Sequence, residues 1–212
     1  MTSQRTRDRL VERLREKGIR NERVLEVIRT TPRHIFVDEA MAHRAYEDSS
    51  LPIGHGQTIS QPYTVARMTE VLLEGGVPDV VLEVGTGSGY QSAILSRLVP
   101  KIYTVERISA LLQKARDAHR KLGLMNVFSN HSDGSWGWEP NAPYPAIMVT
   151  AAPEVVPPSL LQQLDIGGRM VIPVGASGGG QQLKLYTRNE QGIEETILEY
   201  AHFVPLLDGA VR

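Results

Sequence analysis

The chain has 212 residues, of which 41% are hydrophobic and 22% are charged, as is ordinary for a globular protein. Its net charge of −1 gives no bulk attraction for nucleic acid, and the absence of cysteine excludes disulfides and thiolate chemistry. No apolar run approaches the roughly 20 residues of a membrane helix. The polar first ten residues lack the apolar segment of a secretory signal. We therefore expect a cytoplasmic protein with neither nucleic acid nor membrane as a partner.

The first third of the sequence predicts helices around an irregular segment. Apolar residues at helical spacing predict a helix over 5–17, and Asn21 is a plausible N-cap for a second helix. Residues 32–61 are mixed in character and rich in turn formers. Pro62 suits a first helical turn, so a third helix is expected to run from it to about residue 75.

From residue 79 onward, strands and helices alternate. Strands are predicted at 79–84, 101–106, 126–129, 146–150 and 169–174, and helices at 89–98, at 108–122 and from Pro157. This alternation implies right-handed crossovers and a parallel sheet. Extended runs at 181–188 and 193–200 predict an antiparallel hairpin on the sheet edge. The sequence thus predicts a doubly wound, Rossmann-like α/β fold with N-terminal helices.

No linker divides the sequence, so a single domain is expected over residues 1–212. Within it, an N-terminal helical and substrate-side segment would occupy 1–75. A ligand-binding core would occupy 79–175, and a C-terminal hairpin and tail would occupy 176–212.

The stretch Leu82-Glu-Val-Gly-Thr-Gly-Ser-Gly-Tyr90 follows the first strand of the sheet, where open α/β sheets bind ligands. Gly85, Gly87 and Gly89 permit a tight turn and a close approach of a ligand. Their spacing is G-x-G-x-G, whereas a dinucleotide loop reads G-x-G-x-x-G. Glu83 lies beside the loop, where a carboxylate would repel phosphate and favour a cation. S-adenosylmethionine fits this pattern, because it carries a sulfonium and an ammonium but no phosphate.

Further acids follow the next two predicted strands. Glu106 comes 21 residues after Gly85, about where an acid accepts hydrogen bonds from ribose hydroxyls in Rossmann-like folds. Asp133 and Gly134 follow the third strand and are placed to meet the adenine. The three acids in register with the glycine loop favour a cofactor site, and the alternative is a set of structural turns and solvated strand ends.

Five segments of the sequence resemble the protein-L-isoaspartate (D-aspartate) O-methyltransferases. They are Leu51-Pro-Ile-Gly-His-Gly-Gln-Thr-Ile-Ser-Gln-Pro62, Val81-Leu-Glu-Val-Gly-Thr-Gly-Ser-Gly-Tyr-Gln91, Val105-Glu-Arg-Ile108, Gly167-Gly-Arg-Met-Val-Ile-Pro-Val-Gly175 and Phe203-Val-Pro-Leu206. Many methyltransferases share the glycine loop, whereas Gly-Gln-Thr-Ile-Ser-Gln-Pro is specific to this family. The resemblance implies the class I methyltransferase fold. It also implies methylation of the free α-carboxylate of L-isoaspartyl residues in damaged proteins and peptides, which starts their repair through a succinimide.

The resemblance also implies roles for individual residues. Ser60 would lie where the methyl acceptor meets the sulfonium, with Thr58 beside it. The residues implied to hold S-adenosylmethionine are Glu83, Gly85, Thr86, Gly87, Ser88, Gly89, Glu106, Asp133 and Gly134.

The chemistry of the acceptor agrees with a positioning role for Ser60. A carboxylate with an unperturbed pKa of about 4 is ionised at neutral pH, so it needs no general base. The enzyme must instead align the reacting atoms and exclude water, and such alignment can lower a barrier by about 7–11 kcal/mol. Ser60 is therefore predicted to orient the carboxylate, not to attack covalently. The alternative is an N-cap for the helix at Pro62.

Other candidate residues have weaker support. His55 lies between two glycines, which favours a structural or exposed role over a catalytic one. The remaining histidines show no metal-ligand spacing, so no metal is predicted. Trp136 and Trp138 either cover the adenine side of the pocket or simply pack.

Four positions depart from the family pattern: Asp38, Ser132, Pro145 and His202. A second interpretation of the sequence is a methyltransferase for a small molecule, RNA or another kind of protein site, although the near-neutral charge and the 6% aromatic content argue against RNA. The altered Ser132 and Pro145 also leave open a protein that binds S-adenosylmethionine without catalysis. The oligomeric state cannot be read from the sequence, although a monomer is favoured.

Overall fold

The structure is a computed structural model that describes residues 4–212. The chain begins with α1 (Gln4–Glu16) and α2 (Glu22–Thr30), which confirms both predicted helices. Asn21 caps α2, because its side-chain oxygen accepts hydrogen bonds from two backbone N–H groups at 3.1 and 3.2 Å. The expectation that no secretory signal is present rests in part on residues 1–3, which lie outside the described residues.

Residues 33–59 contain more regular structure than the sequence indicated. Two 3-10 helices, η1 (Arg33–Phe36) and η2 (Glu39–Arg44), precede an antiparallel pair, β1 (Leu51–Gly54) and β2 (Gln57–Ile59). The expectation of an irregular segment is therefore wrong for this hairpin. Its turn holds Gly54, His55 and Gly56 at positive φ, and His55 is exposed there. The chain then enters α3 (Pro62–Leu73), as predicted.

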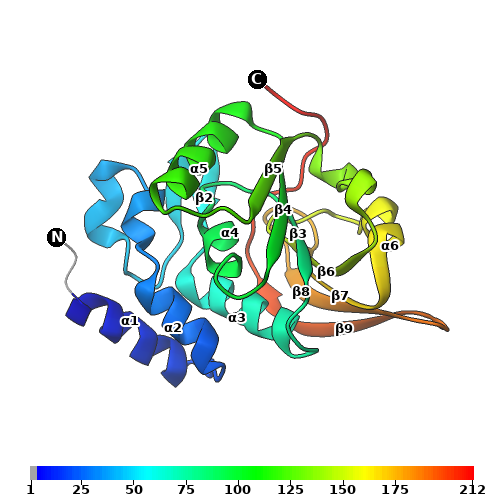
Figure 1. Cartoon of the computed structure of the whole chain (residues 1–212), viewed down its shortest axis with the longest axis horizontal. Coiled ribbons are helices and arrows are strands. Elements are labelled where there is room, and N and C mark those ends of the chain that lie inside the picture. The colour runs from blue at the N-terminus through cyan, green and yellow to red at the C-terminus, as the bar shows by residue number, and fades with distance from the viewer. Residues whose placement is uncertain (1–3) are drawn as a thin grey trace.

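A seven-stranded sheet lies at the centre of the fold (Figure 1). Its strands are β3 (Val80–Val84), β4 (Lys101–Glu106), β5 (Val127–His131), β6 (Tyr144–Val149), β7 (Leu164–Val174), β8 (Gln181–Asn189) and β9 (Gly192–Ala201). The spatial order is β5-β4-β3-β6-β7-β8-β9, in which the first five strands pair in parallel and β8 pairs antiparallel with both β7 and β9. The predicted mostly parallel sheet with a C-terminal hairpin is confirmed.

Helices pack on both faces of this sheet, because its strands bury alternate side chains on opposite sides. Val81 belongs to a core cluster with residues of α1, α2 and α3 and of α4 (Tyr90–Leu95) and α5 (Ser109–Lys121). Leu82, the next residue, belongs to a second cluster with Leu160 of α6 (Pro158–Gln163). The predicted doubly wound arrangement is confirmed.

Three predicted boundaries need correction. The helix after the glycine loop spans 90–95 instead of 89–98, and β7 begins at residue 164 instead of 169. Strand β6 begins at Tyr144, so Pro145 lies inside it. The pairing of β6 with β7 shifts register between Tyr144 and Ala146, which places Pro145 at an irregularity of the ladder, where proline is tolerated.

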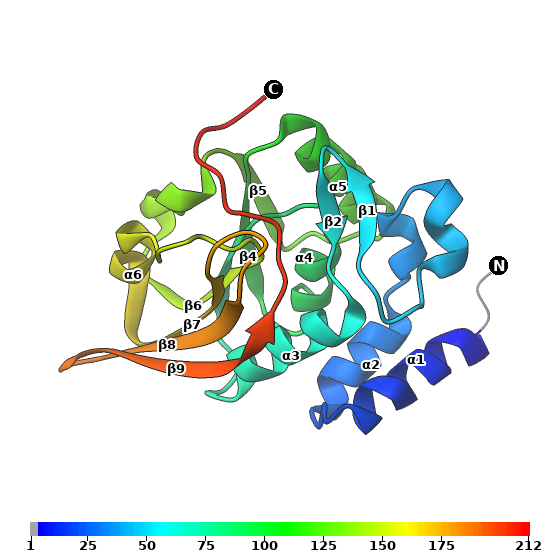
Figure 2. The same cartoon turned by 180° about the vertical axis from the view of Figure 1, so that it is seen from behind.

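The C-terminal tail returns from β9 across the carboxyl ends of the parallel strands (Figure 2). Pro205 bridges to Ala152 and Val211 bridges to Ile108, so the tail is attached at two separate points. This path closes one side of the region that the glycine loop occupies.

Candidate active site

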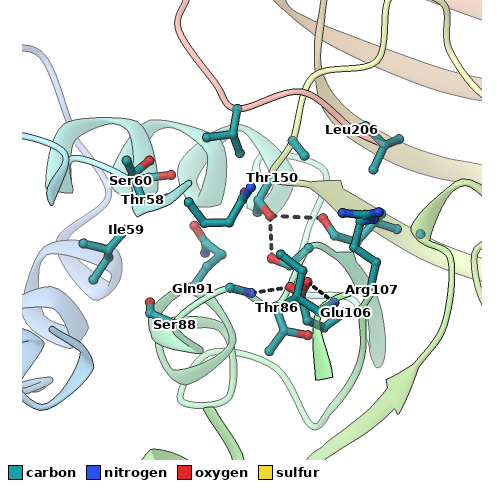
Figure 3. A pocket seen from close by; sticks show the side chains of 18 of the residues that line it. Thr58, Ile59, Ser60, Thr86, Ser88, Gln91, Glu106, Arg107, Thr150 and Leu206 are labelled. Atoms are coloured by element: carbon teal, nitrogen blue, oxygen red, sulfur yellow. Dashed lines mark hydrogen bonds between the residues drawn. The ribbon is translucent and has the colours of Figure 1, made fainter. Parts of the chain in front are cut away.

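A pocket opens at the carboxyl ends of β3 and β4 (Figure 3). Four segments bound it: residues 57–60, 84–88 and 105–108, and the tail at 204–207. The empty space between these segments is about 790 Å³, including the part that is open to solvent. The structure thus brings the Ser60 segment and the glycine loop to one pocket.

The glycine loop has a backbone that side chains would not tolerate. Gly85, Gly87 and Gly89 have φ values of +97°, +52° and +85°. A Cβ atom on Gly85 would lie 2.5 Å from the hydroxyl oxygen of Thr150, which itself donates to the Gly85 carbonyl at 2.6 Å. Gly85 and Gly87 line the pocket with Thr86 and Ser88, whereas Gly89 lies outside the lining.

Glu106 fixes the glycine loop and also faces the pocket. One of its oxygens accepts from the backbone N–H of Gly87 at 2.8 Å, and the other accepts from that of Ile108 at 2.9 Å. The residue is only 6% exposed. A carboxylate has about four acceptor sites, so lone pairs remain for hydroxyl groups of a ligand.

Glu83 lies beneath the loop, outside the pocket lining. It accepts hydrogen bonds from the hydroxyls of Ser92 and Thr104, and Thr86 in turn donates to Thr104 at 2.7 Å. Complete burial raises the pKa of the Glu83 carboxyl to about 7, although the two hydroxyls lower it. The structure places the Glu83 carboxyl under the loop and not in the pocket wall. Its predicted direct contact with a cationic ligand is therefore not seen and stays a prediction.

Asp133 connects the loop after β5 to the C-terminal tail and is not part of the pocket lining. Its carboxylate accepts from the N–H and hydroxyl of Ser135 and from the N–H of Gly209, at 2.6–2.8 Å. Burial raises the pKa of Asp133, but these hydrogen bonds outweigh it and the net pKa is lowered. The neighbouring Gly134 does line the pocket, and a Cβ there would lie 2.7 Å from Val84.

Ser60 and Thr58 approach the pocket from the side opposite Thr86 and Glu106 (Figure 3). The N-cap of α3 is Gln61, so the alternative interpretation of Ser60 as an N-cap is wrong. The backbone carbonyl of Ser60 accepts from the buried guanidinium of Arg33 at 3.1 Å, which fixes the segment while leaving the hydroxyl to the pocket.

Several lining residues were not singled out by their sequence. Gln91 lies inside the helix predicted at 89–98, Thr150 ends the strand predicted at 146–150, and Arg107 follows Glu106. The tail at 204–207 was noticed only as a family motif. Contacts far apart in the chain bring it to the pocket: Arg107 donates to the carbonyls of residues 208 and 209, and Ala152 exchanges hydrogen bonds with the tail backbone.

The aromatic candidates lie away from the pocket lining. Trp136 is exposed, and Trp138 packs edge-on against Tyr103 with ring centroids 5.1 Å apart. Packing therefore accounts for Trp138. In residues 4–212, no three or more His, Asp and Glu side chains gather as a metal site would require. Over the same residues, no helix has the length and apolar character needed to cross a membrane.

Comparison with known proteins decides the family. The model of the protein-L-isoaspartate(D-aspartate) O-methyltransferase family matches residues 5–211. The chain belongs to this family. It is 63% identical over 212 residues to the protein-L-isoaspartate O-methyltransferase of Hahella chejuensis, with 100% of both chains covered. It is 58% identical over 211 residues to that of Pseudomonas aeruginosa, again with 100% of both covered.

Solved structures agree with the family assignment. One protein-L-isoaspartate O-methyltransferase superposes with a TM-score of 0.85 at 26% identity, covering 94% of this methyltransferase and 65% of that chain. A Plasmodium falciparum structure described as a complex with S-adenosyl-L-homocysteine superposes with a TM-score of 0.82 at 24% identity, covering 93% and 96%. The second likeness concerns the fold alone. The expected class I methyltransferase fold is confirmed.

Proposed function

We propose that the pocket between the Ser60 segment and the glycine loop is where this methyltransferase binds its cofactor and its acceptor. The chain is a protein-L-isoaspartate O-methyltransferase, an enzyme that uses S-adenosylmethionine to methylate isoaspartyl residues of proteins. One observation carries the assignment of the site: Ser60 and Glu106 come from distant segments and line the same pocket.

The residues of the pocket fit S-adenosylmethionine. Glu106 retains acceptor capacity for the two ribose hydroxyls. Gly85 and Gly134 leave no space for a Cβ atom, so the backbone itself forms the cradle. A guanidinium beside a cofactor site could bind a phosphate, but that of Arg107 donates to carbonyls of the tail. This agrees with a cofactor that has no phosphate. When bound, S-adenosylmethionine supplies an electrophilic methyl group on a positively charged sulfur.

The chain's own residues supply orientation and exclude water. We assign the Ser60 hydroxyl to orienting the isoaspartyl carboxylate, with Thr58 beside it. The charged residues in the lining are Glu106 and Arg107, and neither lies on the Ser60 side. An ionised carboxylate needs no proton removed, so this composition suits the acceptor. Ile59, Val204 and Leu206 give the pocket apolar walls that reduce its contact with water.

We further propose that the enzyme acts as a monomer in the cytoplasm, on proteins and peptides and not on nucleic acid. The net charge of −1 supports the exclusion of nucleic acid. We also propose that residues 1–212 form one domain, with the substrate-side segment at 1–75, the cofactor core at 79–175 and the hairpin and tail at 176–212.

A pair of peptides tests the proposed substrate. The two share one sequence and differ only in an isoaspartyl or an aspartyl linkage, and methyl incorporation from labelled S-adenosylmethionine is measured for each. We expect incorporation into the isoaspartyl peptide alone. Equal incorporation into both would contradict the substrate assignment. Normal cofactor binding with no incorporation into any isoaspartyl peptide would indicate a binding protein without catalysis.

A further inference from the structure

Gln91 is a pocket residue whose side chain is nearly buried. It belongs to the first turn of α4, is 8% exposed, and contributes to the lining between the glycine loop and the Ser60 segment. Figure 3 shows its side chain projecting into the space between Ser60 and Thr86. We propose that the Gln91 side-chain oxygen accepts a hydrogen bond from the α-ammonium group of S-adenosylmethionine. The inference rests on the proposed function, because it takes this pocket to be the cofactor site.

The hydrogen bonds around Gln91 fix which way its amide points. The hydroxyl of Thr69 lies 2.7 Å from the carbonyl of Val65, one turn earlier in α3, and donates its single hydrogen there. Thr69 can therefore only accept from Gln91, whose Nε2 lies 3.0 Å away. The amide NH₂ thus faces Thr69 and the carbonyl oxygen faces the pocket. Within residues 4–212, Gln91 Oε1 receives no hydrogen bond.

An acceptor that faces the pocket without a donor from the protein is available to a ligand, and the charges nearby indicate which kind of donor it would meet. The acidic group in the lining is Glu106, which holds the loop and is assigned to the ribose. Glu83 is beneath the loop. The ammonium group of the cofactor therefore meets a neutral acceptor. Gln91 Oε1 is such an acceptor, and the hydrogen bond from Gln91 to Thr69 already orients it toward the pocket. The same oxygen would repel the α-carboxylate of the cofactor.

The position of Gln91 agrees with the length of the cofactor. With the ribose at Glu106 and the reactive methyl group directed toward Ser60, the amino-acid part must occupy the remaining space beside the glycine loop. Gln91 borders that space. The residue would thus distinguish ligands that carry the amino-acid part from 5′-methylthioadenosine, which has the adenosine and sulfur but no ammonium.

Calorimetric titration of the full chain tests this assignment. S-adenosylhomocysteine and 5′-methylthioadenosine are titrated into the native protein and into Gln91→Leu. We expect the Kd of S-adenosylhomocysteine to rise by roughly 10- to 100-fold, as for loss of a hydrogen bond to a charged group. The Kd of 5′-methylthioadenosine should stay within about twofold. Gln113→Leu serves as the matched control, because Gln113 is exposed on α5 and bonds to Asp117.

Two further variants keep the inference testable if Gln91→Leu folds poorly. Gln91→Glu keeps an acceptor and adds negative charge, so its Kd for S-adenosylhomocysteine should remain within about threefold of native. Thr69→Val removes the hydrogen-bond acceptor that holds the Gln91 amide. It should raise the Kd of S-adenosylhomocysteine without changing that of 5′-methylthioadenosine. Loss of affinity in Gln91→Glu as large as in Gln91→Leu would overturn the assignment.

Other outcomes also separate the inference from the proposed function. Equal weakening of both ligands in Gln91→Leu would show that the residue shapes the loop and would overturn the assignment. An unchanged S-adenosylhomocysteine Kd with a raised KM for isoaspartyl peptide would place Gln91 on the substrate and overturn it as well. Failure of the native chain to bind either ligand would instead overturn the proposed cofactor site, and the inference with it.

Discussion

At Glu83, burial and hydrogen bonding act on one carboxyl group in opposite directions. Leu82, the residue before Glu83 in β3, packs with Leu160 of α6, whereas Glu83 faces Ser92 on α4. Strand alternation could have predicted this side of the sheet from the sequence. The depth of the carboxyl could not be predicted, because it depends on Thr104 from the neighbouring strand and on the loop that closes above.

The raised pKa of Glu83 predicts a pH-dependent stability. Its folded pKa of about 7 exceeds the ordinary value of 4.5 for an exposed glutamate. The folded state therefore binds the proton more tightly, and this contribution is complete below about pH 4.5 and is lost as the pH rises through about 7. Its size is on the order of 3 kcal/mol. Urea unfolding between pH 5 and 8 should show a steeper loss of stability in the native chain than in Glu83→Gln.

The control for this measurement is Glu16→Gln, because Glu16 is exposed on α1. Glu16→Gln should follow the native pH dependence throughout. Parallel curves for the native chain and Glu83→Gln would show that Glu83 does not bind a proton differently in the folded and unfolded states.

Among the structural elements, the glycine loop was the most predictable and the hairpin at 51–59 the least. The loop has a spacing with a direct physical meaning, since each glycine adopts positive φ. The hairpin strands are only four and three residues long, and β1 contains Pro52. Its turn also places His55, a residue with a Cβ, at positive φ. Strands this short carry too few residues for an alternating pattern to emerge.

Two glycines with positive φ separate the effect of strain from that of close contact. Gly85→Ala would place a methyl group against the Thr150 hydroxyl, whereas Gly123→Ala would meet nothing within 4 Å. Both substitutions force an unfavourable φ, at a cost of about 1–2 kcal/mol. Gly85→Ala should lose a further ~1–3 kcal/mol through overpacking. Urea unfolding of both variants measures the difference, and equal losses would show that Thr150 moves aside freely.

At the scale of the whole molecule, one hydrophobic core includes residues of the N-terminal helices, the parallel strands and the C-terminal hairpin. The main cluster includes Leu14 of α1, Ile59 of β2, Val81 of β3 and Leu183 of β8. The sequence indicated apolar residues in the helices, but not that those of α1 to α5 share one cluster while Leu160 of α6 belongs to the second. The course of the C-terminal tail was equally hidden, because its contacts with Arg107 and Asp133 span long sequence separations.

This continuous core predicts a single cooperative unfolding transition. Both tryptophans lie between β5 and β6, so fluorescence reports on that part, whereas far-ultraviolet circular dichroism also reports on α1 and α2. We expect the two signals to give the same midpoint in urea. A helical transition at distinctly lower urea would contradict the proposal of one domain.

The division of labour within the pocket is tested most directly by the Kd of S-adenosylhomocysteine, measured by calorimetry for Glu106→Ala and Ser60→Ala. Because Glu106 is assigned to the ribose and holds the glycine loop, its loss should raise this Kd at least about tenfold. Ser60→Ala should leave the Kd within about threefold of native, while its turnover of isoaspartyl peptide falls at least about tenfold. An unchanged Kd in Glu106→Ala, or a weakening in Ser60→Ala of the same size, would contradict the account.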